Sequence, residues 1–279
     1  MLPFTTYLGR DWKNADARRV TLKCDLLTRH GEPSTILSDS EIGFAGNPNM
    51  LNRLKWRLGF SAPPQIQGAS TIPVVSLGDL LGTAKPEIHL TIQRYEDGML
   101  PSEQAMALLA IAVATAPKSV LEIGTFMGHT TKLLAMNLPE AIIHSVDLPL
   151  DFIPEHGNVI EKKKDDFHLI AKRQVGREYR GTLYETRIRQ HFGDTAVWNF
   201  KEAAGATLFF IDGSHTYDYC KNDSERCYEL CRGKGVFLWH DCDDTHPGVV
   251  KVLLEWRALG RSVVRIDRTP IAYWNGNLG

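Results

Sequence analysis

Short apolar runs alternate with helix-like segments from residue 101 to residue 260. The runs are typical of buried strands, and the segments between them carry apolar residues at helical spacing. We expect strands at 118–124, 141–148, 186–193, 206–213 and 235–241, and helices at 101–116, 129–138, 217–231 and 247–260. Strands that alternate with helices in this way predict a parallel, doubly wound sheet.

Two further apolar runs, 262–269 and 271–278, follow with almost no linker between them. A parallel pair of strands needs a crossover of roughly a dozen residues or more, so this pair must be antiparallel. The predicted fold class is therefore α/β, with a Rossmann-like, doubly wound and mostly parallel sheet that ends in an antiparallel hairpin.

The first 90 residues lack this regularity. Their short apolar runs are separated by turn-rich stretches such as "GEPS", "GNPN" and "SAPPQ". We expect residues 1–90 to form an N-terminal extension or small subdomain, and residues 91–279 to form one α/β domain. An irregular extension often lies against a second subunit, so a homo-oligomer is a further expectation.

Charge and composition narrow the classes of partner. The formal net charge of the 279-residue chain is -1, which gives no basic field for nucleic acid or anionic lipid. No apolar run approaches the roughly 18 residues of a membrane span, and the N-terminus lacks a secretory signal pattern. The five cysteines include no CxxC pair and suggest reduced thiols. We expect a cytoplasmic protein that binds neither nucleic acid nor membrane.

Acidic residues stand at or near the ends of successive expected strands. Any one of them is as well explained as a turn or capping residue. Together they favour a functional site, because open α/β sheets bind ligands at the carboxyl edge of their strands. The polar residues at this edge, in chain order, are Glu122, Asp147, Asp194, Asp212 and the pair His240–Asp241.

The first strand–helix junction, "VLEIGTFMGHTT", contains Gly124 and Gly128. Glycine lets a backbone approach a ligand closely at the start of a helix. The spacing G-x-x-x-G is not the G-x-G-x-x-G of dinucleotide binders, which disfavours a nicotinamide-dependent oxidoreductase. The alternative for the glycine pair is close packing of a helix on a strand.

These motifs, in this order, resemble those of class I S-adenosylmethionine-dependent methyltransferases. The closest resemblance is to the metal-dependent O-methyltransferases of the catechol, macrocin and cephamycin-cluster types. It rests on "VLEIGTFMGHTT", "SVDLP", "GDTAVW", "FFIDGSHTYDYCKND" and "GVFLWHD", and it covers roughly residues 95–279. The closing hairpin also matches the class I sheet, whose final strand is antiparallel.

The resemblance implies a role in cofactor binding for several of these residues. Gly124 and Gly128 would pass close to the methionine portion of S-adenosylmethionine. Asp147 would bind its ribose, and Asp194 would lie near its adenine. Glu122 and Asp212 are also expected at the cofactor site.

The resemblance further implies a divalent metal ion, Mg²⁺ or Mn²⁺, held by Asp212 and Asp241. The family usually places an acid or amide beside the second aspartate, and here the neighbour is His240. We expect His240 to be the third ligand, with Asp244 as a competitor. A histidine among carboxylates suits Mn²⁺ or another transition ion better than Mg²⁺.

His215 follows Asp212 by three residues on the same loop. Its imidazole titrates near neutrality, so it could serve as the general base that takes a proton from a hydroxyl. The alternative is a loop histidine that bonds to the backbone.

The resulting hypothesis is an enzyme. We expect metal-assisted transfer of a methyl group from S-adenosylmethionine to a hydroxyl of a small molecule, such as a sugar or another acceptor in natural product biosynthesis. One alternative is a metal-independent N- or C-methyltransferase, which would not need both Asp212 and Asp241. The other is a non-catalytic nucleotide-binding module, which the intact set of acids disfavours.

Overall fold

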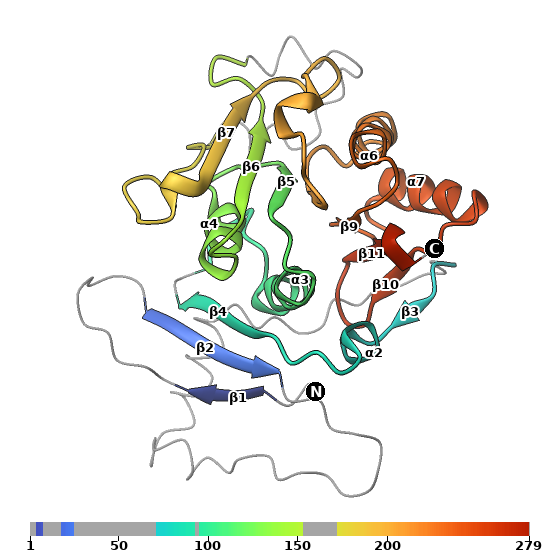
Figure 1. Ribbon diagram of the computed structural model, residues 1–279. Coiled ribbons are helices and arrows are strands. Elements are labelled where there is room, and N and C mark those ends of the chain that lie inside the picture. The colour runs from blue at the N-terminus through green and yellow to red at the C-terminus, as the bar shows by residue number, and fades with distance from the viewer. Residues whose placement is uncertain (1–3, 8–17, 25–70, 93–94, 153–171, 279) are drawn as a thin grey trace, which may run out of the picture.

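The fold was analysed in a computed structural model, which describes residues 4–7, 18–24, 71–92, 95–152 and 172–278. Its centre is an eight-stranded sheet (Figure 1) with the strand order β3-β10-β11-β9-β8-β5-β6-β7. Five neighbouring strands are parallel to one another. They are β5 (Ser119–Ile123), β6 (Ile142–Asp147), β7 (Ile188–Phe192), β8 (Leu208–Ile211) and β9 (Val236–Trp239).

The closing hairpin is antiparallel, as its short connection predicts. It consists of β10 (Val264–Ile266) and β11 (Ala272–Asn275), with Val264 paired to Tyr273. Strand β11 also runs antiparallel to β9, and β3 (Val74–Val75) adds a short parallel edge to β10. The predicted α/β fold class is confirmed.

Helices cover both faces of the sheet, and two hydrophobic clusters fill the space between them. One face holds α3 (Ser102–Thr115) and α4 (His129–Asn137), and the other holds α6 (Tyr217–Cys231) and α7 (Pro247–Ala258). Strand β8 shows that apolar side chains point to both faces of the sheet, so that helices must bury both. Leu208 and Phe210 point into the first cluster, while Phe209 and Ile211 point into the second. This alternation follows from the two-residue period of a strand.

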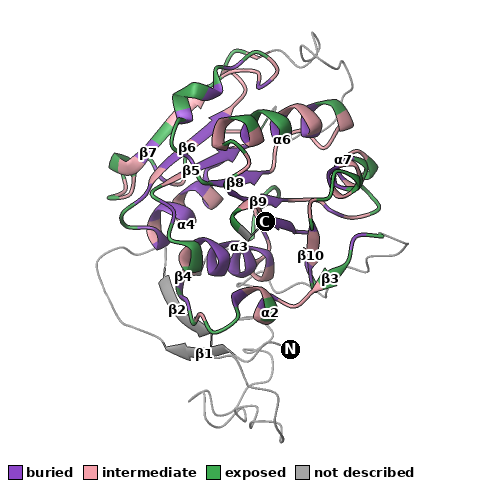
Figure 2. Cartoon of the chain, turned by 45° about the vertical axis from the view of Figure 1, so that its right-hand side comes forward, coloured by how far each residue is buried: buried purple, intermediate pink, exposed green. Residues whose placement is uncertain are grey.

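Helix α3 is buried along most of its length, as the purple ribbon in Figure 2 shows. Every residue from 104 to 112 is buried, which explains why "AMALLAIA" is apolar on all sides rather than on one stripe. Gln104 is the polar exception in this segment. Its position near the start of α3 brings it to the carboxyl edge of the sheet, where it meets the site described below.

A second, three-stranded antiparallel sheet has the order β1-β2-β4. Its strands are β1 (Phe4–Tyr7), β2 (Arg18–Cys24) and β4 (Glu87–Ile92), and α2 (Leu77–Leu81) precedes β4. The expected division between residues 90 and 91 falls inside β4, whose Ile88 and Leu90 join the core beside α3. Residues 25–70 of the expected extension lie outside the described ranges.

Three short 3₁₀ helices complete the described elements: η2 (Glu185–Arg187), η3 (Phe200–Ala203) and η4 (Gly276–Leu278). Among the described helices, none has the length and apolar character that crossing a membrane requires.

The chain leaves the centre of the sheet in two directions. It runs from β5 outward to β6 and β7, and then returns to β8 on the other side of β5. The loop after β5 leads to α4 on one face of the sheet, and the loop after β8 leads to α6 on the other face. Such a reversal opens a crevice at the carboxyl ends of the strands, which is where this type of sheet binds its ligands.

Candidate active site

A cavity of about 520 Å³ lies at this reversal point. Loops that follow β5, β6, β8 and β9 form its walls, together with the segment that leads into α3. Its volume falls in the range of small-molecule sites. Most of the residues expected at the site line it, including Gly124, Asp147, Asp212, His215, His240 and Asp241.

Gly124 and Gly128 both adopt left-handed backbone conformations, with φ of 97° and 84°. A Cβ atom on Gly124 would lie 2.0 Å from the carbonyl oxygen of Asp212, so the two loops touch at this point. A Cβ on Gly128 would lie 2.7 Å from the ring of Tyr179. Gly124 lines the cavity, whereas Gly128 lies behind it against Tyr179. Close packing accounts for Gly128, and both packing and ligand access account for Gly124.

Asp147, at the end of β6, holds the loop that follows β5. Its Oδ2 accepts hydrogen bonds from the backbone N–H groups of Thr125 at 3.1 Å and Phe126 at 2.7 Å. Its Oδ1 lies 3.7 Å from Nε of Arg173. Burial raises the pKa of Asp147, and these donors oppose that shift. Asp147 stands in the cavity wall, where the ribose was expected.

Asp194 lies just beyond β7, and its side chain turns away from the cavity. Tyr219 donates its hydroxyl to Oδ2 at 2.7 Å, and the Ala196 N–H donates to Oδ1 at 2.9 Å. The neighbours Gly193 and Thr195 line the cavity instead. The side chain of Asp194 therefore shapes the turn on the expected adenine side.

Glu122 is completely buried beneath the glycine loop. Thr131 and Ser145 each donate a hydroxyl to its Oε2 at 2.5 Å. Burial raises the pKa of Glu122 to about 8, despite the two hydroxyl donors. At neutral pH the carboxyl is therefore mostly protonated, and it connects β5 to β6 and α4 rather than facing the cavity.

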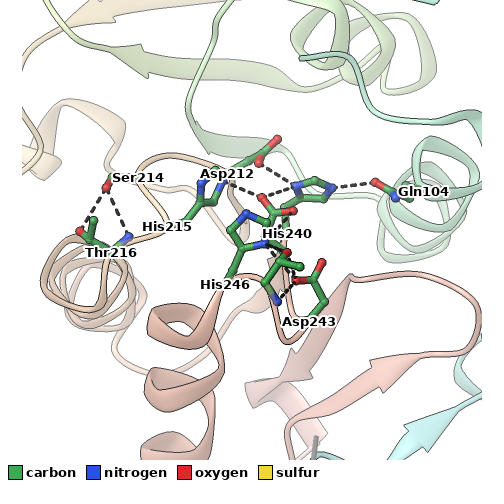
Figure 3. Close-up of polar contacts among 10 residues, drawn as sticks. Gln104, Asp212, Ser214, His215, Thr216, His240, Asp243 and His246 are labelled. Atoms are coloured by element: carbon green, nitrogen blue, oxygen red, sulfur yellow. Dashed lines mark hydrogen bonds and ion pairs between the residues drawn. The ribbon is translucent and has the colours of Figure 1, made fainter. Parts of the chain in front are cut away.

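Asp212, His240 and Asp241 form a cluster on the cavity wall (Figure 3). The Nδ1 atom of His240 lies 3.0 Å from Oδ1 of Asp212 and 2.9 Å from Oδ2 of Asp241. The other ring nitrogen of His240, Nε2, lies 2.6 Å from Oε1 of Gln104. Gln104 thus turns the imidazole so that Nδ1 faces both carboxylates.

The charges in this cluster explain its pKa values. Burial lowers the pKa of His240, but the two aspartates outweigh burial and raise it to about 10. Burial likewise opposes the shift of Asp241, whose hydrogen bonds with His215 and His240 hold its pKa well below the ordinary value. A proton on His240 therefore sits between two carboxylates. That is the position and the charge sign that a bound cation would take over.

Asp244, the competing candidate for the third ligand, is exposed on the loop after β9. It does not belong to either group of potential metal ligands found among the described residues. The geometry groups His240, rather than Asp244, with the two aspartates.

His215 points at the same cluster from the loop after β8. Its Nε2 lies 2.6 Å from Oδ2 of Asp241, and its ring is tilted against that of His246, with 4.5 Å between the ring centres. Asp241 thus contacts three histidines, and its φ of 57° lies in the left-handed region. A strained backbone at a residue with three partners is typical of a functional site.

Three residues that take part in this site, Gln104, Arg173 and His246, were not among the site residues predicted from the sequence. Gln104 had one signal, since it is the polar residue of an otherwise apolar helix segment. Arg173 lies in a stretch rich in charges and had none. His246 precedes Pro247 in a way that suits a turn as well as a site, and the sequence alone does not bring it to Asp241.

Residues 121–242 match a family model described as a methyltransferase domain. No curated protein sequence matches the chain. Similar solved structures include cofactor-bound Rv0187 from MTB, at 17% identity over 82% of this chain and 97% of that one, with a TM-score of 0.47. Another is the O-methyltransferase TomG from Streptomyces achromogenes, involved in tomaymycin synthesis and solved with S-adenosylmethionine, at 20% identity over 60% and 73%, with a TM-score of 0.40.

A third is the S-adenosylhomocysteine-bound methyltransferase PaMTH1 of Podospora anserina, at 15% identity over 64% of this chain and 81% of that one, with a TM-score of 0.42. The family match contains the glycine loop and all three residues of the Asp212 cluster. The sheet has the mostly parallel order and the antiparallel last strand that the resemblance implied. Residues 121–242 are therefore similar in sequence to a methyltransferase domain, and the sheet around them has the expected topology.

Proposed function

We propose that the protein transfers the methyl group of S-adenosylmethionine to a hydroxyl oxygen of a small molecule, with the help of a divalent metal ion. One observation carries the proposal. Asp212, His240 and Asp241 bring three potential ligand atoms together on the wall of the cavity, with His240 Nδ1 within 3.0 Å of both carboxylates.

The donor set fits a divalent ion. Two carboxylates supply the oxygen ligands that Mg²⁺ and Mn²⁺ prefer, and the imidazole favours Mn²⁺. The Gln104 contact to His240 Nε2 is the kind of outer hydrogen bond that orients a histidine ligand. An ion held there would lower the pKa of an acceptor hydroxyl and hold its oxygen in place.

His215 is the proposed general base. Its Nε2 lies 2.6 Å from the Asp241 carboxylate in this structure and would have to leave that contact to receive the hydroxyl proton. The nearby negative charge of Asp241 would stabilise the resulting imidazolium. In the transfer itself, the bond between sulfur and the methyl carbon breaks as the bond from oxygen to that carbon forms. The sulfonium charge is lost, and the proton ends on His215.

The remaining cavity residues would bind the methyl donor. Asp147 lies at the end of β6, where a carboxylate can bind the two ribose hydroxyls. Gly193 and Thr195 line the part of the cavity beside Asp194, which suits the adenine. Because Gly124 has no side chain, its loop can closely approach the methionine portion of S-adenosylmethionine. A sugar or another natural-product hydroxyl is the proposed acceptor class, on the strength of the sequence resemblance.

The test compares two aspartates that follow neighbouring strands, Asp212 after β8 and Asp244 after β9. Asp212→Ala removes a proposed ligand, and Asp244→Ala removes an exposed carboxylate from the neighbouring loop. With S-adenosylmethionine and a panel of sugars and phenols, formation of S-adenosylhomocysteine should be lost in the first variant and kept in the second. Equal turnover in both variants would contradict the proposed metal site.

A further inference from the structure

A second group of potential metal ligands adjoins the first. His215, Asp241 and His246 each present one ligand atom, and these atoms all lie within 4.8 Å of one another. The two groups share Asp241, but not in the same way. Its Oδ2 lies 2.6 Å from Nε2 of His215 and 2.9 Å from Nδ1 of His240. Its Oδ1 lies 3.7 Å from Nδ1 of His246.

The backbone holds these three residues in place. His215 lies on the loop after β8, Asp241 on the loop after β9, and His246 at the start of α7. A Cβ on Gly248, in the first turn of α7, would lie 2.5 Å from the carbonyl oxygen of His215. The start of α7 is therefore pressed against the His215 loop, and the two histidines cannot separate without unpacking it.

The side chains are partly buried and face the cavity. Their exposed fractions are 17% for His215, 13% for Asp241 and 29% for His246, and all three line the cavity wall. Figure 3 shows the rings of His215 and His246 converging on the region between Asp212 and Asp243. An ion bound there would have protein on one side and open positions for water or a ligand on the other.

We propose that His215, Asp241 and His246 form a second metal site, selective for a borderline transition ion such as Zn²⁺ or Co²⁺. Two imidazole nitrogens and one carboxylate oxygen make a donor set that such ions prefer and that Mg²⁺ does not. The first site, with two carboxylates and one imidazole, offers more oxygen ligands and discriminates less against Mg²⁺ and Mn²⁺. The shared Asp241 would place the two ions side by side.

The surroundings of His246 strengthen this selectivity. Its Nδ1 lies 3.0 Å from Oδ1 of Asp243, closer than to Asp241. An ion that binds through this nitrogen has to replace the contact with Asp243. An ion with high affinity for imidazole does so more readily, which again favours Zn²⁺ or Co²⁺ over Mg²⁺.

The second site would oppose the proposed reaction; this consequence, and the equivalent of metal expected at the first site in the test below, rest on the proposed function. His215 Nε2 is the atom that would take the acceptor proton. An ion bound to that nitrogen occupies its lone pair. Zn²⁺ in excess over Mg²⁺ should therefore inhibit methyl transfer.

The test is a titration of the metal-free protein with Co²⁺, followed by its visible absorption and by calorimetry. The wild type should bind two equivalents. His246→Ala should bind one, and His240→Ala should also bind one, because each variant keeps the other site. Asp241→Ala should bind none. Circular dichroism checks the fold of each variant, and His246→Asn replaces His246→Ala if the latter unfolds.

The outcomes separate the two sites. A His246 variant that binds Co²⁺ with wild-type stoichiometry and affinity would overturn the second site. A wild type that binds a single equivalent, lost in the His240 variant and kept in the His246 variant, would overturn it as well. If the single equivalent is instead lost only in the His246 variant, the second site stands and the metal site of the proposed function falls.

Discussion

Single residues in this protein depart most from the sequence expectations where burial decides their role. Glu122 and Asp194 were both expected at the cofactor site, and both end up bonded to hydroxyl groups of the protein. The sequence places an acid at a strand end, but it does not show toward which side the acid turns. That choice depends on partners such as Thr131 and Tyr219, which come from other elements.

Glu122 should make the stability of the protein depend on pH. Folding raises its pKa from 4.5 to about 8, so the folded protein keeps a proton that the unfolded chain releases. This contribution is complete below about pH 4.5 and is lost as the pH rises through 8. Glu122→Gln has no such proton. Between pH 5 and pH 8, the free energy of unfolding of the wild type should fall by on the order of 2–4 kcal/mol relative to that of the variant.

Urea unfolding of both proteins across that pH range measures the difference. Other titrating groups, such as Asp223, are common to both and cancel. Parallel pH profiles for the wild type and the variant would show that Glu122 is not protonated in the folded protein.

His215 should affect turnover far more than folding. Loss of a general base lowers kcat by roughly 10²–10⁴, so His215→Ala should fall in that range. A sugar alcohol is less acidic than a phenol and depends more on the base, so its rate should fall further. Rates on both acceptor types give the comparison. A variant with near-normal rates on its acceptor would assign the proton transfer to another group.

At the scale of elements, the sequence was informative about strands and poor about contacts between distant segments. Period and turn residues predicted the five parallel strands, and the short linker required the antiparallel hairpin. The contact between Gln104 and His240 was not foreseeable, because 136 positions separate them and only the packed fold brings α3 under β9. Arg173 reaches Asp147 in the same way, from a stretch without regular pattern.

The contact between the loops after β5 and β8 gives a prediction at this scale. Gly124 and Gly205 have nearly equal φ values of 97° and 94°, but a Cβ on Gly124 would meet the Asp212 carbonyl, while one on Gly205 meets nothing within 4 Å. Gly205→Ala carries only the backbone penalty of about 1–2 kcal/mol. Gly124→Ala adds an overpacking penalty of roughly 1–3 kcal/mol.

Chemical denaturation of the two variants should therefore show Gly124→Ala to be the less stable. Its cofactor affinity should also fall, since the carbonyl it displaces belongs to Asp212. Equal losses of stability in the two variants would mean that the loops can move apart at little cost.

In the molecule as a whole, the reversal of strand order between β5 and β8, together with the pairing of β8 with β9, is what assembles the site. It opens the cavity, and it brings Asp212 and Asp241 together from neighbouring strands. The sequence could predict that these acids share an edge, because the edge follows from the parallel order. It could not predict that three histidines would converge on Asp241, since His246 arrives there only through the packing of α7.

Methyl transfer by this protein is proposed to need a divalent ion at Asp212, His240 and Asp241. The most direct measurement is the rate of S-adenosylhomocysteine formation by the wild-type protein with an active acceptor, before and after exhaustive chelation and then with Mg²⁺ or Mn²⁺ added back. Chelation should abolish turnover while S-adenosylmethionine still binds, and the added ion should restore turnover. Turnover that persists at its original rate in the chelated protein would mean that no metal ion takes part in the transfer.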